Sequence, residues 1–169
     1  MLQVKDRHFL KKKVLIELKE KLINLYPMKD NEIFPKSSKI EMVKTEKDLI
    51  IYFINDEAML IQDRDLLFPT LNAVLDKKFK LFEASVDKGA IKFVANGADV
   101  MIPGIVNVDE SIEKGNIIAV VDDEFKKTLA IGLALMSANE IKKNKNGKAI
   151  KSIHHIGDKI WNTIKNLKS

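Results

Sequence analysis

The feature that most constrains the fold is a short unit punctuated by glycines, "SVDKGAIKFVANGADVMIPG" at residues 85–104. Asp87 suits a helix N-cap, because its carboxylate can accept hydrogen bonds from free backbone N–H groups. Gly97 suits the left-handed residue that follows a helix. The apolar residues after Gly97 indicate a strand, which Pro103-Gly104 ends in a turn. No residue type in the unit suggests a nucleophile, a metal ligand or an acid–base pair.

The rest of the C-terminal half predicts a β-rich region with short helices. Ser137 precedes Glu140 by three residues, the spacing of a capping box, and so predicts a helix over 137–143. The predicted strands are "GNIIAVVDDE", "TLAIGLALMS" and "GKAIKSIHHI", at residues 115–124, 128–137 and 147–156. The closing "GDKIWNTIKNLK" is read as a short helix or a packed tail.

The N-terminal half begins with a helical pattern over residues 8–26, which Pro27 ends. Residues 28–38 read as a loop, and residues 39–70 read as short antiparallel strands. Pro69 is placed as the first residue of a short helix that runs to Leu75. These patterns together predict an α+β fold.

Net charge is +5, and it is unevenly distributed along the chain. Residues 140–169 carry a charge of +6 and residues 1–21 a charge of +4, so the remaining middle has a charge of −5. A basic tail of this kind can bind polyphosphate by releasing counterions. A solvated, lysine-rich surface with no ligand is the alternative reading.

Composition limits the chemistry. The absence of Cys excludes disulfides and thiolate metal sites. His154 and His155 would point to opposite faces of a strand, so neither a metal site nor a cofactor is expected. The apolar runs are too short to cross a bilayer, and the first residues have no apolar core of signal-peptide type. We therefore expect a cytoplasmic protein with no membrane partner.

Four blocks of the C-terminal half, in order, resemble the PUA domain, an RNA-binding module first named from pseudouridine synthases and archaeosine transglycosylases. The blocks are "VDKGAIKFVANGADVMIPGI", "GNIIAVVDD", "LAIGLALMS" and "GKAIKSIHHIGDKIW". The most specific parts are "GADVMIPG" and the ending with His, Gly-Asp and Trp. The resemblance implies a PUA pseudobarrel over residues 83–169.

The N-terminal half resembles the pre-PUA domain of the malignant T-cell amplified protein family, in its "PK" segment, its strand pair through "NDE" and its "FPTL". This implies a small α/β pre-PUA domain over residues 1–82. Proteins of this family act in translation and associate with the small ribosomal subunit and with tRNA acceptor ends. Their eukaryotic members pair with a protein that has an initiation-factor-like domain. "IVNVDESIEKGN" and "RHFLKKK" resemble archaeal sequences more than eukaryotic ones.

The resemblance also implies which residues contact RNA. Carried over position by position, these are Lys88, Gly89, Ala90, Gly97, Ala98, Met101, Pro103 and Gly104. Physical reasoning adds Lys92, Lys148 and Lys151 as phosphate contacts, and His154 as a group that stacks on a base or hydrogen-bonds to RNA. Asp87, Gly97 and Gly104 also have a purely structural reading, as a helix cap and as turn residues. Met101 can equally belong to the core.

Three functions remain open at this stage. The first is a non-enzymatic RNA-binding protein of the translation machinery that contacts tRNA or small-subunit ribosomal RNA during initiation or recycling. The second is an RNA-binding accessory subunit of an RNA-modification complex. The first 80 residues argue against an autonomous enzyme, since they lack a glycine-rich cofactor loop and are short for a catalytic domain. The third makes the N-terminal half a protein-docking module.

Overall fold

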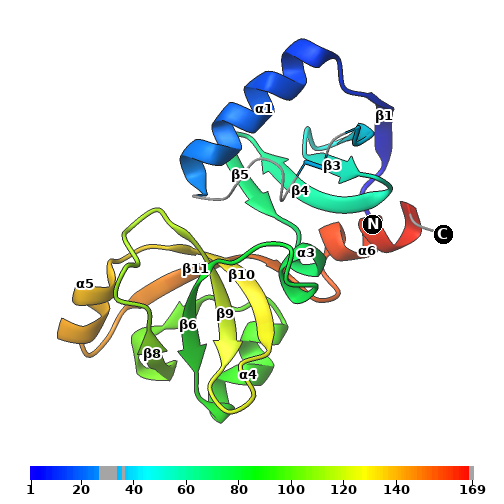
Figure 1. Ribbon diagram of the computed structural model, residues 1–169. Coiled ribbons are helices and arrows are strands. Elements are labelled where there is room, and N and C mark those ends of the chain that lie inside the picture. The colour runs from blue at the N-terminus through cyan, green and yellow to red at the C-terminus, as the bar shows by residue number, and fades with distance from the viewer. Residues whose placement is uncertain (27–33, 36, 168–169) are drawn as a thin grey trace. The chain divides into compact units, whose positions relative to one another are not determined.

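The computed structural model describes residues 1–26, 34–35 and 37–167. The chain has the predicted α+β fold and divides into two compact units (Figure 1). Unit 1 comprises Met1–Lys78 with Thr163–Ser169, and unit 2 comprises Phe79–Asn162. The predicted domain boundary between residues 82 and 83 stays a prediction. Most of the predicted loop at 28–38 lies outside the described residues.

Unit 1 is built on a five-stranded antiparallel sheet in the order β1-β2-β3-β4-β5. Its elements are β1 (Val4–Phe9), α1 (Lys12–Leu25), β2 (Ile40–Thr45), β3 (Ile50–Ile54), β4 (Glu57–Asp63), β5 (Leu66–Pro69) and α3 (Leu71–Leu75). Each strand follows its neighbour in sequence, so the sheet is a meander. Its core includes Val43, Ile51 and Leu60, together with Leu22 of α1.

The structure corrects two boundaries in unit 1. The predicted helix at residues 8–26 begins only at Lys12, because His8 and Phe9 belong to the edge strand β1 and pair with β2. Pro69 does not open a helix, because it ends β5 and pairs with Leu60. The cap of α3 is Thr70, whose hydroxyl accepts a hydrogen bond from the backbone N–H of Ala73.

Unit 2 is built on a six-stranded sheet in the order β7-β11-β10-β9-β6-β8. Its elements are β6 (Phe82–Val86), α4 (Lys88–Ala95), β7 (Val100–Met101), the 3-10 turn η1 (Ile102–Gly104), β8 (Ile105–Val108), β9 (Ile117–Asp122), β10 (Thr128–Ala134), α5 (Ala138–Lys143), β11 (Lys148–His155) and α6 (Lys159–Leu167). The predicted strands and the capping box at Ser137 are confirmed. The closing segment forms α6, which begins in unit 2 and ends in unit 1.

The sheet of unit 2 curls into a near-barrel. Its two outermost strands, β7 and β8, are consecutive in the chain and are joined only by η1. Three residues lie between Met101 and Ile105, so the four Cα-to-Cα steps of the chain bring the two sheet ends to within about 14 Å of one another. Such a short link across a six-stranded sheet requires strong curvature. The pseudobarrel expected for this half is therefore present.

The interior of unit 2 is apolar and is closed on one side by α4, which contacts β9, β10 and β11 (Figure 1). Alternating residues of the strands point inward, as strand geometry requires. Its fully or almost fully buried members include Ala84, Val86, Val94, Val100, Ile112, Ile118, Val120, Ala130, Ala149 and Ile150. Asp87 and Lys88 at the start of α4, and Asn96 at its end, are exposed.

Candidate nucleic-acid interface

The start of α4 is fixed by Asp87, as predicted. Asp87 Oδ1 accepts a hydrogen bond from the Ala90 N–H at 2.8 Å, and the Asp87 N–H donates to the Gly104 carbonyl at 3.0 Å. A Cβ on Gly104 would lie 3.3 Å from the Ala90 Cβ, so the end of η1 packs closely on the helix. The Asp87 cap occupies the Ala90 N–H, which is therefore not open to a phosphate.

The other end of α4 depends on Gly97. This residue has φ +88° and donates a hydrogen bond to the Val94 carbonyl, while the Ala98 N–H donates to the Phe93 carbonyl. A Cβ on Gly97 would lie 2.4 Å from Nε2 of His155, because the imidazole packs against the glycine. Gly97 is thus required twice, by the left-handed backbone and by the close approach of β11.

The predicted lysines of β11 lie on the surface beside β7. Lys148 pairs with Met101 across the two strands, and the side chain of Met101 is 47% exposed. Lys148 Nζ lies 2.7 Å from Oδ2 of Asp99, whose Oδ1 accepts from the Ser152 N–H at 2.9 Å. The hydrogen bond from Lys148 is the main cause that lowers the pKa of Asp99. Lys151 is exposed on the same strand.

His154 does not occupy the predicted place. Its side chain is 0% exposed, and its Nδ1 lies 2.7 Å from Oδ2 of Asp158. Burial raises the pKa of Asp158, but hydrogen bonds from His154 and from the backbone N–H groups of Trp161 and His155 outweigh it, so the pKa is lowered. A buried imidazole cannot stack on a base. The expectation for His154 is therefore corrected.

His155 is the imidazole that faces Gly97, and the sequence analysis did not select it. Its Nδ1 lies 3.0 Å from the Ile156 carbonyl oxygen, so Nδ1 is the donor and Nε2 is left as an acceptor in the neutral ring. Strand alternation assigned the two histidines to opposite faces, but it did not show which face was buried. Asp158, four residues after His154, was the sequence feature that could have indicated which histidine is buried.

The structure brings several of the expected residues into close pairs on unit 2. Three close pairs define the arrangement: Ala90 with Gly104, Gly97 with His155, and Met101 with Lys148. Lys88 and Lys92 are exposed on α4 and are one helical turn apart. We name this surface the basic lip; it consists of Lys88, Gly89, Ala90, Lys92, Gly97, Ala98, Met101, Pro103, Gly104, Lys148, Lys151 and His155.

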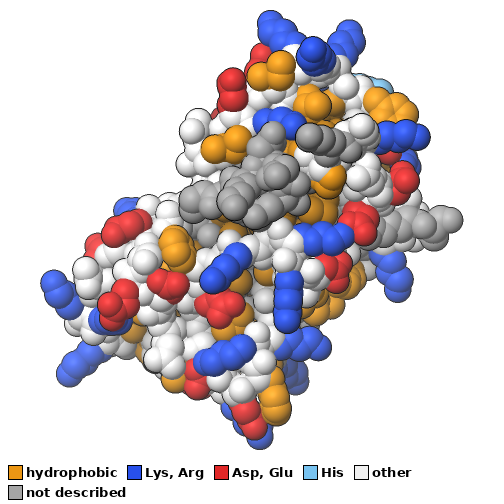
Figure 2. Space-filling model, viewed as in Figure 1, with side chains coloured by type: hydrophobic (Ala, Val, Ile, Leu, Met, Phe, Trp, Pro, Cys, Tyr) orange, Lys and Arg blue, Asp and Glu red, His pale blue; other side chains and the backbone are white. Residues whose placement is uncertain are grey.

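Positive charge at the start of the chain is also on the surface. Figure 2 shows Lys and Arg side chains gathered over the beginning of α1 in unit 1. Lys11, Lys12 and Lys13 are all exposed there. Within the described ranges, no three His, Asp or Glu residues form a group suited to a metal ion, and no helix is long and apolar enough to span a membrane.

Comparison with protein families covers both halves of the chain. Residues 83–156 match the PUA domain, and residues 6–77 match a domain of unknown function (DUF1947). The chain is 40% identical over 161 residues to an uncharacterized protein of Methanocaldococcus jannaschii, covering 95% of this chain and 98% of the relative. It is 35% identical over 168 residues to translation machinery-associated protein 20 of Saccharomyces cerevisiae, covering 94% and 93%.

The likeness extends to an animal protein and to a solved structure. Malignant T-cell-amplified sequence 1 of Danio rerio is 31% identical over 159 residues, covering 90% of this chain and 88% of the relative. The crystal structure of a hypothetical protein from Pyrococcus horikoshii superposes with a TM-score of 0.81 at 35% identity, covering 94% and 99%. The two-part organisation is therefore shared over nearly the full length of these proteins.

Proposed function

This chain belongs to the family of translation machinery-associated protein 20 and malignant T-cell-amplified sequence 1, and on that premise we propose that it is a non-enzymatic RNA-binding protein of the translation machinery. The observation that carries the proposal is the basic lip of its PUA domain. That surface places exposed lysines beside the two ends of α4, and exposed lysines suit a ribose-phosphate chain.

Each part of the lip has a role in this proposal. Lys148 and Lys151 contact phosphates, and Lys88 and Lys92 extend the positive surface along α4. Gly97 and Gly104 allow the close packing that shapes the lip, because His155 packs on Gly97 and Ala90 packs on Gly104. His155 replaces His154 as the group that hydrogen-bonds to a base or a 2′-hydroxyl.

We propose tRNA or small-subunit ribosomal RNA as the RNA bound, during initiation or recycling. The small ribosomal subunit is then the site of action, and the cytoplasm is its location. The proposal includes an initiation-factor-like protein as a further partner. Support comes from the relatives named for the translation machinery.

The test is a salt titration of binding. Full-length protein is mixed with a tRNA acceptor-stem hairpin and with small-subunit rRNA hairpins, between 50 and 200 mM salt (about the range in which phosphate contacts are resolved). Each lysine–phosphate contact contributes about 0.7–0.9 to the slope of log K against log salt. Lys148→Gln with Lys151→Gln should reduce that slope by about 1.4–1.8. No binding at the lowest salt, or a flat slope, contradicts the proposal.

A further inference from the structure

A second surface of unit 2 lies on the outer face of the sheet, where β8, β6 and β9 are neighbours. It is hollowed, with a volume of about 290 Å³. We name it the acidic face; it is lined by Glu83, Ser85, Asn107, Val108, Asp109, Val121 and Lys126, with Asp123 beside it. It shares no residue with the basic lip.

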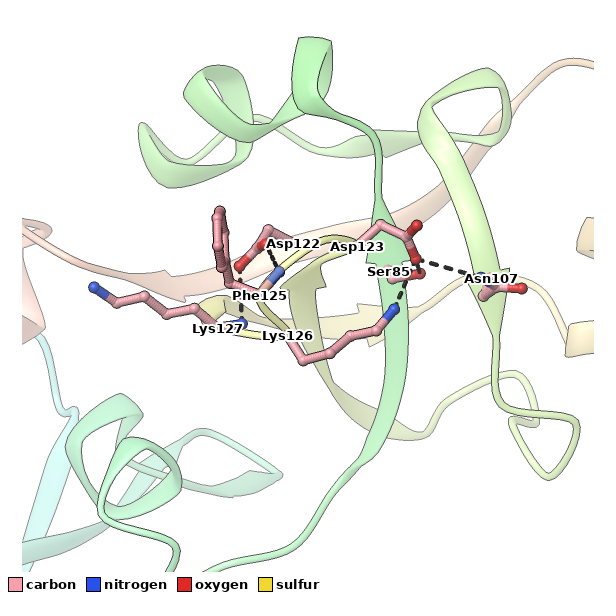
Figure 3. Close-up of polar contacts among 7 residues, drawn as sticks. All are labelled: Ser85, Asn107, Asp122, Asp123, Phe125, Lys126 and Lys127. Atoms are coloured by element: carbon pink, nitrogen blue, oxygen red, sulfur yellow. Dashed lines mark hydrogen bonds and ion pairs between the residues drawn. The ribbon is translucent and has the colours of Figure 1, made fainter.

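Asp123 organises this surface. Its Oδ1 accepts hydrogen bonds from the Ser85 hydroxyl at 2.7 Å, from the Asn107 amide at 3.3 Å and from the Lys126 ammonium at 2.7 Å (Figure 3). Lys126 first, and Ser85 next, hold the pKa of Asp123 at about 2. Within the described part of the chain, Oδ2 of Asp123 makes no hydrogen bond. One carboxylate oxygen is therefore free to accept.

The charge of the hollow favours a cation. Glu83 and Asp109 line it from β6 and from the end of β8, and Asp123 adds a third carboxylate. Lys126 is the one basic residue among the lining residues, and its ammonium already rests on Asp123. Three carboxylates against one ammonium repel a phosphate and attract a guanidinium, whose several N–H donors can contact more than one carboxylate.

The turn above the hollow is held in a fixed conformation. Asp122 accepts hydrogen bonds from the N–H of Phe125 at 2.6 Å and from the N–H of Lys127 at 2.8 Å. The turn therefore presents Phe125, which is 79% exposed, on a backbone that is already ordered. Figure 3 shows Phe125 and Lys127 on one side of the turn, and Lys126 with Ser85 and Asn107 on the other. Exposed aromatic residues on ordered backbone are frequent anchors of protein interfaces.

We propose that the acidic face is a docking site for a basic segment of a partner protein, with one arginine or lysine in the hollow and an apolar side chain against Phe125. In the free protein the Lys126 ammonium occupies the position that the partner's cation takes on binding. The partner's cation displaces the Lys126 ammonium from Asp123. A second copy of this chain would bring the same carboxylates to the hollow if the two acidic faces met, so like charges oppose that arrangement. The proposal does not depend on RNA binding.

The test uses a synthetic peptide that alternates arginine and leucine, added to the full-length protein and followed by amide chemical shifts in NMR. The matched control peptide has citrulline in place of arginine, which keeps the shape and removes the charge. Shifts are expected at Glu83, Ser85, Asn107, Asp109 and residues 122–127 with the arginine peptide only. Equal shifts with both peptides, or shifts confined to other residues, overturn the proposal.

Two lysine variants separate a specific site from general attraction. Lys126→Gln removes the internal competitor and should tighten peptide binding about fivefold, whereas Asp123→Asn should weaken it by a similar factor. Lys127→Gln changes the net charge equally but frees no carboxylate, so affinity should stay within about twofold. Equal effects of the two lysine variants overturn the proposal. Shifts that depend on protein concentration without peptide would assign the surface to a second copy instead, and would also overturn it.

Discussion

The basic lip and the acidic face are built on the same six-stranded sheet of unit 2, yet their charged side chains are held differently. On the lip, Lys148 is paired with Asp99, whereas Lys88, Lys92 and Lys151 are exposed and form no ion pair with the described residues. On the acidic face, Asp123 is tied to Lys126 and to two neutral donors. Loose cations suit a flexible polyanion, whereas a fixed carboxylate suits a guest of defined geometry.

The two surfaces also use backbone differently. The lip depends on close approach, since Gly97 packs on His155 and Gly104 packs on Ala90. The turn beside the acidic face is instead ordered by a side chain, because Asp122 binds two backbone N–H groups. Substitutions that add a Cβ should therefore damage the lip, and substitutions that remove a carboxylate should damage the acidic face.

The largest effect is expected for Gly97→Ala. The left-handed backbone and the clash with His155 together should lower the free energy of unfolding by about 2–4 kcal/mol. RNA affinity should also fall, because His155 is displaced from the lip. Urea unfolding and RNA titration measure the two effects.

Gly115→Ala is the matched control for that substitution. Gly115 has φ +93°, but a Cβ there would meet nothing within 4 Å. Its cost should therefore be only about 1–2 kcal/mol, with unchanged RNA affinity. Equal losses of stability for the two variants would show that the contact with His155 is unimportant.

The second effect concerns charge. Lys148→Glu with Lys151→Glu should weaken RNA binding at low salt by roughly 30- to 100-fold, because two phosphate contacts become repulsive. Lys126→Glu with Lys127→Glu changes net charge equally at the other surface, and should weaken RNA binding by less than about threefold. If both double variants lose RNA equally, net charge rather than the lip governs binding.

The third effect separates the two histidines of β11. His154→Ala removes a buried side chain and one of the hydrogen bonds to the Asp158 carboxylate, and should lower the free energy of unfolding by about 2 kcal/mol, with little change in RNA affinity of the folded protein. His155→Ala should weaken RNA binding and leave the free energy of unfolding nearly unchanged. Stability by thermal unfolding and affinity by fluorescence anisotropy distinguish them, and an exchange of these outcomes would restore His154 to the lip.

The smallest expected effect is a loss of folding stability at acid pH. The pKa of Asp123 is lowered to about 2 in the folded protein, below the ordinary value of about 3.9. The stabilisation from this carboxylate is therefore complete above pH 4 and is lost as the pH falls from about 4 to 2. Asp123→Asn should flatten the stability profile in that window, as measured by urea unfolding. An unchanged profile would mean that the Lys126 contact is not kept in solution.

Local signals could be predicted from the sequence, because they involve residues close together in the chain. The caps at Asp87 and Ser137 and the left-handed Gly97 are of this kind, and all are confirmed. The same short-range reasoning predicts a helix start at Pro69. That prediction is wrong, because the hydroxyl of Thr70 caps α3.

Features that depend on distant pairing could not be predicted in this way. β1 has few apolar residues in alternation, and the partners of β1, β6 and β8 lie far away in the sequence. An irregularity in the pairing of β10 with β11 sets the face of the strand on which His154 lies. Ile131 pairs with His154, but Gly132 pairs with Ser152. The network of Asp123 joins three elements, and so it was invisible until the sheet was assembled.

The most direct test of the RNA surface is photocrosslinking of a tRNA acceptor-stem hairpin that carries 4-thiouridine to the full-length protein, with the attached peptides identified by mass spectrometry. If the basic lip receives the RNA, crosslinks will lie within residues 88–104 and 148–155. Crosslinks confined to residues 83–85, 107–109 and 122–127 would place the RNA on the acidic face and contradict the account.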